Sequence, residues 1–184
     1  LTREAVRAGA LGFSTSRSMN HRGIKGEPTP SLKATEDELT GIAQGLTDAG
    51  RGVLQIISDM AYSQGDELGM VFRIARASGR PCSISLAQSH RKPQDFRTVL
   101  ARIHEEAQAG TRIAAQVAPR AVGVLFGLQA NRSPIHGSQT FLALREREPA
   151  DMVAAMRNPD IRRRILAEAT DNPFLRVDLK PYDY

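Results

Sequence analysis

Four short apolar runs recur along the first two thirds of the chain, and polar residues follow each of them. Short apolar runs bounded by turn residues are typical of buried strands. The sequence therefore predicts four strands, at residues 10–13, 53–57, 82–86 and 113–117.

Amphipathic segments separate these runs and predict helices. Thr35 and the three acidic residues after it form a capping box that begins the first helix, and Gly50 and Gly52 end it. The second helix ends at Gly79, and the third lies between Pro93 and Gly110. Apolar residues recur at helical spacing in all three: Leu39, Ile42, Ala43, Leu46 and Ala49; Leu68, Val71, Phe72 and Ala75; and Phe96, Val99, Leu100, Ile103 and Ala107.

The strands and helices alternate, and successive strands begin about 30 to 40 residues apart, a spacing typical of parallel βα units. Four such units suit either half of a (β/α)8 TIM barrel or an open doubly wound sheet. No G-x-G-x-x-G segment follows any of the strands, and no G-x-x-x-x-G-K-[ST] segment occurs. The sequence therefore favours an α/β fold that is a partial barrel.

The chain ends carry further helical signals. Residues 1–9 are typical of the last turns of a helix that Gly9 closes, and Asn158 with Pro159 begins a helix near the other end. Between them, residues 118–138 form a long apolar connection without clear periodicity. We expect residues 1–184 to be the central part of one barrel, roughly its fourth to seventh strands with a following helical segment, from a longer chain.

Composition narrows the function classes. Of the 184 residues, 41% are hydrophobic and 24% charged, with one cysteine and no apolar run long enough for a membrane span. Because the first residues are polar, we expect no signal peptide. These features favour a cytoplasmic protein without a membrane partner. The net charge of +5 invites a nucleic-acid hypothesis. The basic residues are interspersed with acidic ones and Trp is absent, so no nucleic-acid partner is expected.

Polar residues follow each predicted strand, and in parallel βα units they meet at one end of the sheet. The candidate substrate-binding residues are therefore Ser16, Arg17, His21, Ser58, Asp59, Gln88 and Arg120. His90 and His136 also lie in loops assigned to this side, and His104 is expected on a helix surface.

Residues 12–16 almost form the G-x-S-x-G nucleophile elbow of serine hydrolases, with Ser14 in the nucleophile position. Ser16 replaces the second glycine, and the elbow needs small residues on both sides of its serine, so this hypothesis is disfavoured. No H-x-H, H-E-x-x-H or cysteine pair occurs, and no metal ligand is assigned within the chain.

Three segments together resemble the N-acyl-D-amino-acid deacylases (D-aminoacylases) of the amidohydrolase superfamily: residues 3–17 with the following histidine and arginine, residues 110–128 and residues 157–169. The resemblance implies a metal-dependent (β/α)8 barrel with a small β-domain. It also implies a zinc cofactor that activates water to hydrolyse a linear amide bond of a small-molecule substrate.

The family's H-x-H pair and catalytic aspartate would lie outside this chain, so the chain alone is expected to be inactive. Two customary metal histidines, after the fifth and sixth strands, are replaced by Ser58 and by residues 86–87. Arg17, Gln88 and Arg120 are then candidates for holding a substrate carboxylate or amide. A non-catalytic, ligand-binding barrel remains the alternative to the enzyme.

Overall fold

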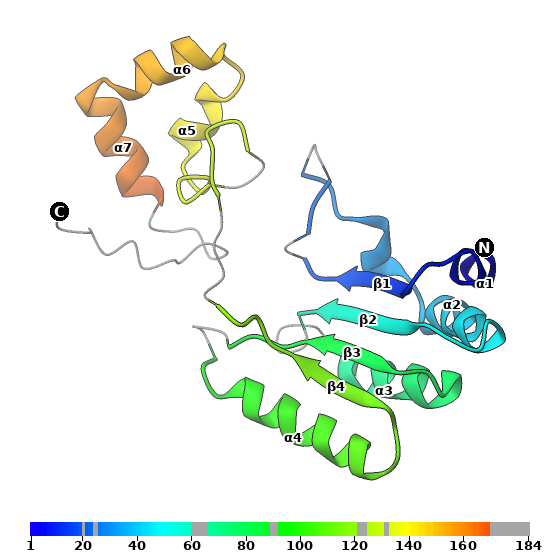
Figure 1. Cartoon of the computed structure of the whole chain (residues 1–184). Coiled ribbons are helices and arrows are strands. Elements are labelled where there is room, and N and C mark those ends of the chain that lie inside the picture. The colour runs from blue at the N-terminus through cyan, green and yellow to red at the C-terminus, as the bar shows by residue number, and fades with distance from the viewer. Residues whose placement is uncertain are drawn as a thin grey trace. The chain divides into compact units, whose positions relative to one another are not determined.

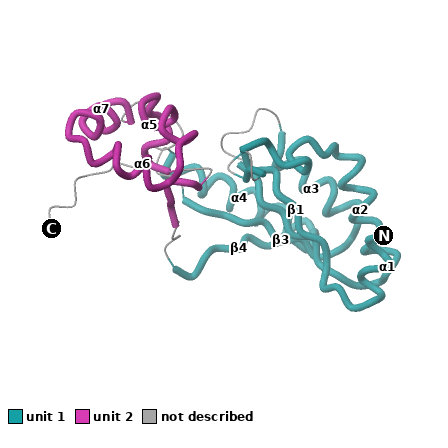
Figure 2. Tube along the Cα trace, turned by 90° about the horizontal axis from the view of Figure 1, so that it is seen from above, with its two compact units in different colours: residues 1–122 teal, residues 123–184 magenta. Residues whose placement is uncertain are grey.

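The computed structural model describes residues 1–19, 21–23, 26–59, 66–88, 92–120, 125–130 and 133–169. The chain divides into two compact units, residues 1–122 (unit 1) and residues 123–184 (unit 2), which Figure 2 distinguishes by colour. Unit 1 holds the predicted strands, and the regular elements described in unit 2 are helices.

Unit 1 alternates strands with helices and builds a parallel sheet (Figure 1). Its described strands pair in the order β1-β2-β3-β4, and each pairing is parallel. Because parallel crossovers are right-handed, this sequential order places the connecting helices on the same face of the sheet. In chain order the elements are α1 (Thr2–Arg7), β1 (Gly12–Arg17), the 3-10 helix η1 (Pro30–Lys33), α2 (Glu36–Asp48), β2 (Val53–Ser58), α3 (Glu67–Ser78), β3 (Cys82–Ser85), α4 (Asp95–Gln108) and β4 (Ile113–Gln116).

The predicted alternation is confirmed, but the position of the first strand was wrong. The strand begins at Gly12 and continues to Arg17, whereas the apolar run had indicated residues 10–13. The register explains the shift, because pairing with β2 runs from Gly12 opposite Val53 to Arg17 opposite Ser58. Backbone hydrogen bonding therefore continues through residues whose side chains are polar, and hydropathy alone does not detect it.

Helix ends agree with the predicted signals. The Thr35 hydroxyl accepts a hydrogen bond from the Glu38 amide and caps α2. Gly79 ends α3 in the left-handed conformation, with a φ of 61°, and its amide bonds to the Ala75 carbonyl. These local rules therefore set the lengths of the helices that cover the sheet.

Alternate residues of the strands point into the core beneath the helices. Leu54 and Ile56 of β2 and Ile84 of β3 are fully buried against residues of α1, α2 and α3. The other face is polar: the Ser14 hydroxyl donates to Gln55 Oε1, and Gln55 Nε2 donates to the Ser85 hydroxyl at 2.9 Å. One face of the sheet thus stabilises the fold, while the other carries a row of hydrogen-bonding side chains.

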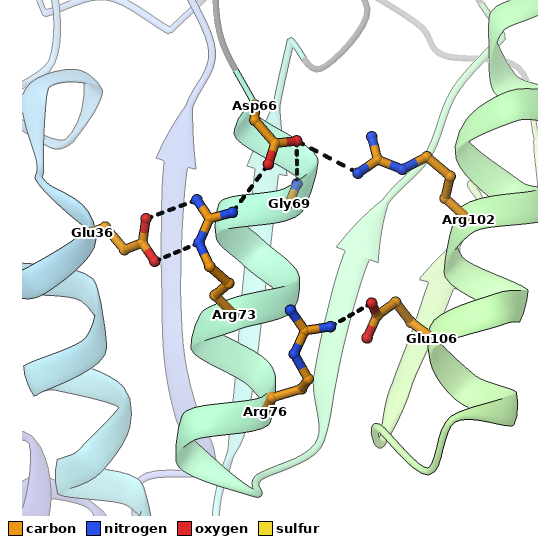
Figure 3. Close-up of polar contacts among 7 residues, drawn as sticks. All are labelled: Glu36, Asp66, Gly69, Arg73, Arg76, Arg102 and Glu106. Carbon is orange, nitrogen blue, oxygen red and sulfur yellow. Dashed lines mark hydrogen bonds and ion pairs between the residues drawn. The ribbon is translucent and has the colours of Figure 1, made fainter.

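Ion pairs connect the three crossover helices on their outer surface (Figure 3). Arg73 of α3 binds both carboxylate oxygens of Glu36 in α2, at 2.8 and 2.9 Å, and also contacts Asp66 at 3.0 Å. Arg76 pairs with Glu106 of α4 at 2.5 Å. Arg73 and Arg76 are therefore matched by acidic partners within the same helical layer.

Unit 2 contains α5 (Gln139–Leu144), α6 (Pro149–Met156) and α7 (Pro159–Ala169). The helix predicted after Asn158 is confirmed, and the Asn158 side chain accepts from the Asp160 amide at 2.9 Å. The two shorter helices were not predicted. Among the described residues of this unit, a buried hydrophobic cluster contains Phe141, Leu144, Met152 and Ile165.

Within the described parts of both units, no helix combines the length and apolar character that crossing a membrane requires.

Candidate functional site

The carboxyl ends of β1 and β2 gather a group of polar residues, which we term the strand-end cluster. Five of its members were expected from the sequence, and Ser18 and Glu67 were not. The cluster consists of Ser16, Arg17, Ser18, His21, Ser58, Asp59 and Glu67.

Arg17 binds Glu67 at the start of α3 through two hydrogen bonds. Arg17 Nε lies 2.8 Å from Glu67 Oε2, and Nη2 lies 2.7 Å from Oε1. The side chains are only 12% and 15% exposed, and a third guanidinium nitrogen donates to the Ala34 carbonyl at 2.5 Å. The guanidinium lowers the pKa of Glu67 through these hydrogen bonds, and the carboxylate in turn raises the pKa of Arg17. All three guanidinium nitrogens of Arg17 therefore bind other groups of the protein.

Ser58 takes part in the same ion pair. Its hydroxyl donates to Glu67 Oε2 at 3.2 Å, and it lies opposite Arg17 in the β1–β2 register. Arg17 and Ser58 share the sheet face on which the helices pack, because both follow the alternation set by Thr15 and Ile56. Arg17 and Ser58, both candidates from the sequence, thus connect β1 and β2 to Glu67 of α3.

Asp59 organises the loop that follows β1. Its Oδ1 accepts from the Ser18 hydroxyl and its Oδ2 accepts from the Met19 amide, both at 2.6 Å. The Ser18 carbonyl then accepts from the His21 amide at 3.1 Å. Asp59 therefore anchors the turn that carries His21.

Ser16 and His21 lie in direct contact. Ser16 Oγ is 2.5 Å from His21 Nδ1, and Ser16 Oγ also accepts from the Ser18 amide at 3.3 Å. The Ser31 hydroxyl donates to the Ser16 carbonyl at 2.7 Å. Because successive strand residues point to opposite faces, Ser16 faces away from the helices that hold Arg17.

The structure does not bring every candidate into this cluster. Gln88 donates to the Pro93 carbonyl at 3.0 Å in the loop before α4. Arg120 is exposed beyond β4, and no ion pair or hydrogen bond joins its side chain to the described part of the chain. His104 is exposed on α4, as predicted, whereas His90 lies outside the described residues. His136 belongs to unit 2, where it contacts Arg145.

The described residues do not fit the zinc site that the family resemblance implies. Among them, no three His, Cys, Asp or Glu side chains gather as a metal site requires. The two carboxylates of the strand-end cluster are also held by protein groups, Asp59 by Ser18 and Met19 and Glu67 by Arg17. These carboxylates therefore act as anchors for the loop and for α3.

Sequence reasoning missed Glu67 because it precedes the predicted apolar stripe of α3 by one residue. An acidic residue in the first turn of a helix is a common feature with no bias toward a site. The topology of the βα units could have indicated it. The helix after β2 begins at the same end of the sheet at which β1 ends, so its first residues lie near the polar residues after β1.

Comparisons of the chain with models of protein families, with curated proteins and with solved structures gave no match.

Proposed function

We propose that the chain forms part of a (β/α)8 barrel hydrolase that cleaves the linear amide bond of a small N-acyl amino acid. The sequential parallel order of β1 to β4 supports this proposal, because a closed barrel repeats that arrangement. Barrel active sites lie at the carboxyl ends of the strands, where the strand-end cluster is found. The sequence resemblance to D-aminoacylases supplies the reaction class.

Two residues have side chains suited to a substrate of this class. Arg120 presents a guanidinium beyond the end of β4, and a guanidinium binds a carboxylate through two parallel hydrogen bonds. Ser16, on the face opposite the helices, offers a hydroxyl beside the His21 imidazole. Arg17, Ser58 and Asp59 have a structural role in this proposal, because their side chains bind other protein groups. A cytoplasmic location, which the single cysteine favours, and a zinc ion bound through groups other than the described residues belong to the same proposal.

A ligand-binding barrel without catalysis is the second candidate. It is favoured by the side chains at the two positions where the family carries metal-binding histidines. Ser58 at the first position donates to Glu67 and serves the ion pair with Arg17. Residues 86–87 at the second position are leucine and alanine, which cannot bind a metal ion through their side chains.

Assays of the complete barrel protein that contains this chain, with N-acetyl amino acids of both configurations and zinc supplied, test the two candidates. Release of acetate supports the hydrolase, and replacing Arg120 with alanine should raise KM about ten-fold or more. Arg112 precedes β4 at the opposite end of the sheet, so Arg112→Ala is the matched control and should leave KM unchanged. Saturable binding of the same compounds without acetate release favours the ligand-binding barrel. Neither binding nor release would reject both.

A further inference from the structure

We propose that Ser16 is an acyl-accepting nucleophile and that His21 is its general base, so that the chain takes acyl groups from activated esters. Ser16 Oγ lies 2.5 Å from His21 Nδ1, within the distance at which a base removes a hydroxyl proton. This activity is separate from the amide hydrolysis proposed above and needs no metal ion.

The hydrogen bonds around Ser16 orient its hydroxyl toward the imidazole. The Ser18 amide donates to Ser16 Oγ at 3.3 Å and therefore occupies an acceptor position of that oxygen. In the His21 tautomer that carries its proton on Nε2, Nδ1 is an acceptor and the Ser16 hydroxyl donates to it. A nucleophilic serine requires this orientation.

The turn that carries His21 is held in place by an anchored carboxylate. Asp59 accepts from Ser18 Oγ and from the Met19 amide, both at 2.6 Å. Ser18 in turn accepts from the His21 amide through its carbonyl, at 3.1 Å. The backbone on the other side is fixed by Ser31, whose hydroxyl donates to the Ser16 carbonyl. Nucleophile and base are therefore both tied to the ends of β1 and β2.

Ser14 is the residue that the near-match to a nucleophile elbow singles out, but its surroundings differ. It lies two positions earlier on β1 and on the same sheet face, and its hydroxyl donates to the side-chain amide oxygen of Gln55. An amide oxygen is too weak a base to remove a hydroxyl proton. Ser16 is therefore the candidate nucleophile because its neighbour is an imidazole, whereas Ser14 has only an amide oxygen beside it.

The probe for this reaction is p-nitrophenyl acetate. The Ser16 oxygen forms a bond to the acetyl carbon while its proton moves to His21 Nδ1. The bond from the acetyl carbon to the p-nitrophenyl oxygen breaks, and p-nitrophenolate leaves with the electron pair. The protonated imidazole releases its proton to solvent, and the product is O-acetyl Ser16. Water can then hydrolyse this ester in a second step.

The experiment incubates the full chain with p-nitrophenyl acetate in the presence of a metal chelator. It follows p-nitrophenolate release and locates the acetyl group by fragment-ion mass spectrometry. The tryptic peptide of residues 8–17 contains both serines, so the fragments separate Ser14 from Ser16. We expect acetylation on Ser16 in the wild type and at the same rate in Ser14→Ala.

Ser16→Ala should lose the modification, and His21→Ala should form it about a hundred-fold more slowly. Added imidazole should restore part of the rate to His21→Ala, because the serine remains in place. Circular dichroism of each variant verifies that it folds. Acetylation of Ser16 at an unchanged rate in folded His21→Ala, or acetylation found only at lysines, would overturn the proposal. Failure of the N-acetyl amino acid assay leaves this result unaffected, because the two assays use different substrates and only one supplies zinc.

Discussion

Arg17 at the end of β1 and Glu67 in the first turn of α3 form a two-point ion pair that is largely shielded from solvent, with nitrogen–oxygen distances of 2.8 and 2.7 Å. The pair connects the first strand to the helix that follows the second. It explains why two polar residues that lie 50 positions apart in the chain are found on the covered side of the sheet.

Replacing Arg17 with alanine should lower the free energy of unfolding of unit 1 by about 3 kcal/mol, because the substitution leaves the Glu67 carboxylate shielded and unpaired. Urea unfolding followed by circular dichroism measures the change. Arg120→Ala is the matched control, since the Arg120 side chain is exposed, and it should leave the midpoint unchanged. A loss smaller than about 1 kcal/mol for Arg17→Ala would show that the ion pair contributes no more than a surface pair.

Glu168 of α7 should remain ionised to low pH. Its carboxylate accepts from the Thr140 amide and from the hydroxyls of Ser138 and Thr140, and these hydrogen bonds lower its pKa from 4.5 to about 2. Because the folded-state pKa is lowered, its contribution to stability is present above pH 4.5 and is lost as the pH falls toward 2. Carboxyl ¹³C NMR titration measures the pKa directly. In Thr140→Val, which removes one donor, the pKa should rise toward 4.5; an unchanged value would contradict the assignment.

Gly12→Ala should destabilise unit 1 by more than about 2 kcal/mol, because the added Cβ would lie only 2.0 Å from the Val53 carbonyl oxygen. Backbone on the neighbouring strand cannot move aside without breaking the pairing of β1 with β2. Gly41 in the middle of α2 has open space at the same position, so Gly41→Ala should stabilise the helix by roughly 0.5–1 kcal/mol. Thermal unfolding of the two variants compares them, and equal effects would reject the close approach.

Cys82 should resist alkylation while the protein is folded. Its side chain is 3% exposed within the core, and burial raises the pKa of the thiol to about 12. The thiolate is the reactive form, so labelling by iodoacetamide should proceed only through opening of unit 1 and should accelerate sharply in urea. Stoichiometric labelling within minutes in native buffer, measured by intact mass, would contradict this expectation.

The sequence predicted the elements of unit 1 well because their signals are local. A cap at Thr35, a left-handed glycine at Gly79 and apolar residues at helical spacing depend only on neighbours in the chain. The first strand was misplaced because its outer half, Ser14 to Arg17, is polar and is held in the sheet by pairing with β2. The short helices α5 and α6 were missed for a related reason, since their apolar residues become a core only when α7 packs against them.

For the site, the sequence alone predicted that Ser16, Arg17, Ser58 and Asp59 follow neighbouring strands and so lie at the same end of the sheet. The tertiary structure decided what each side chain does. Ser16 and Arg17 are adjacent in the chain, but successive residues of a strand point to opposite faces. Arg17 therefore contacts Glu67, whereas Ser16 contacts His21. Contacts between residues far apart in sequence decide which face of the sheet the helices cover and which loop lies against the other face. Local sequence patterns do not predict such contacts.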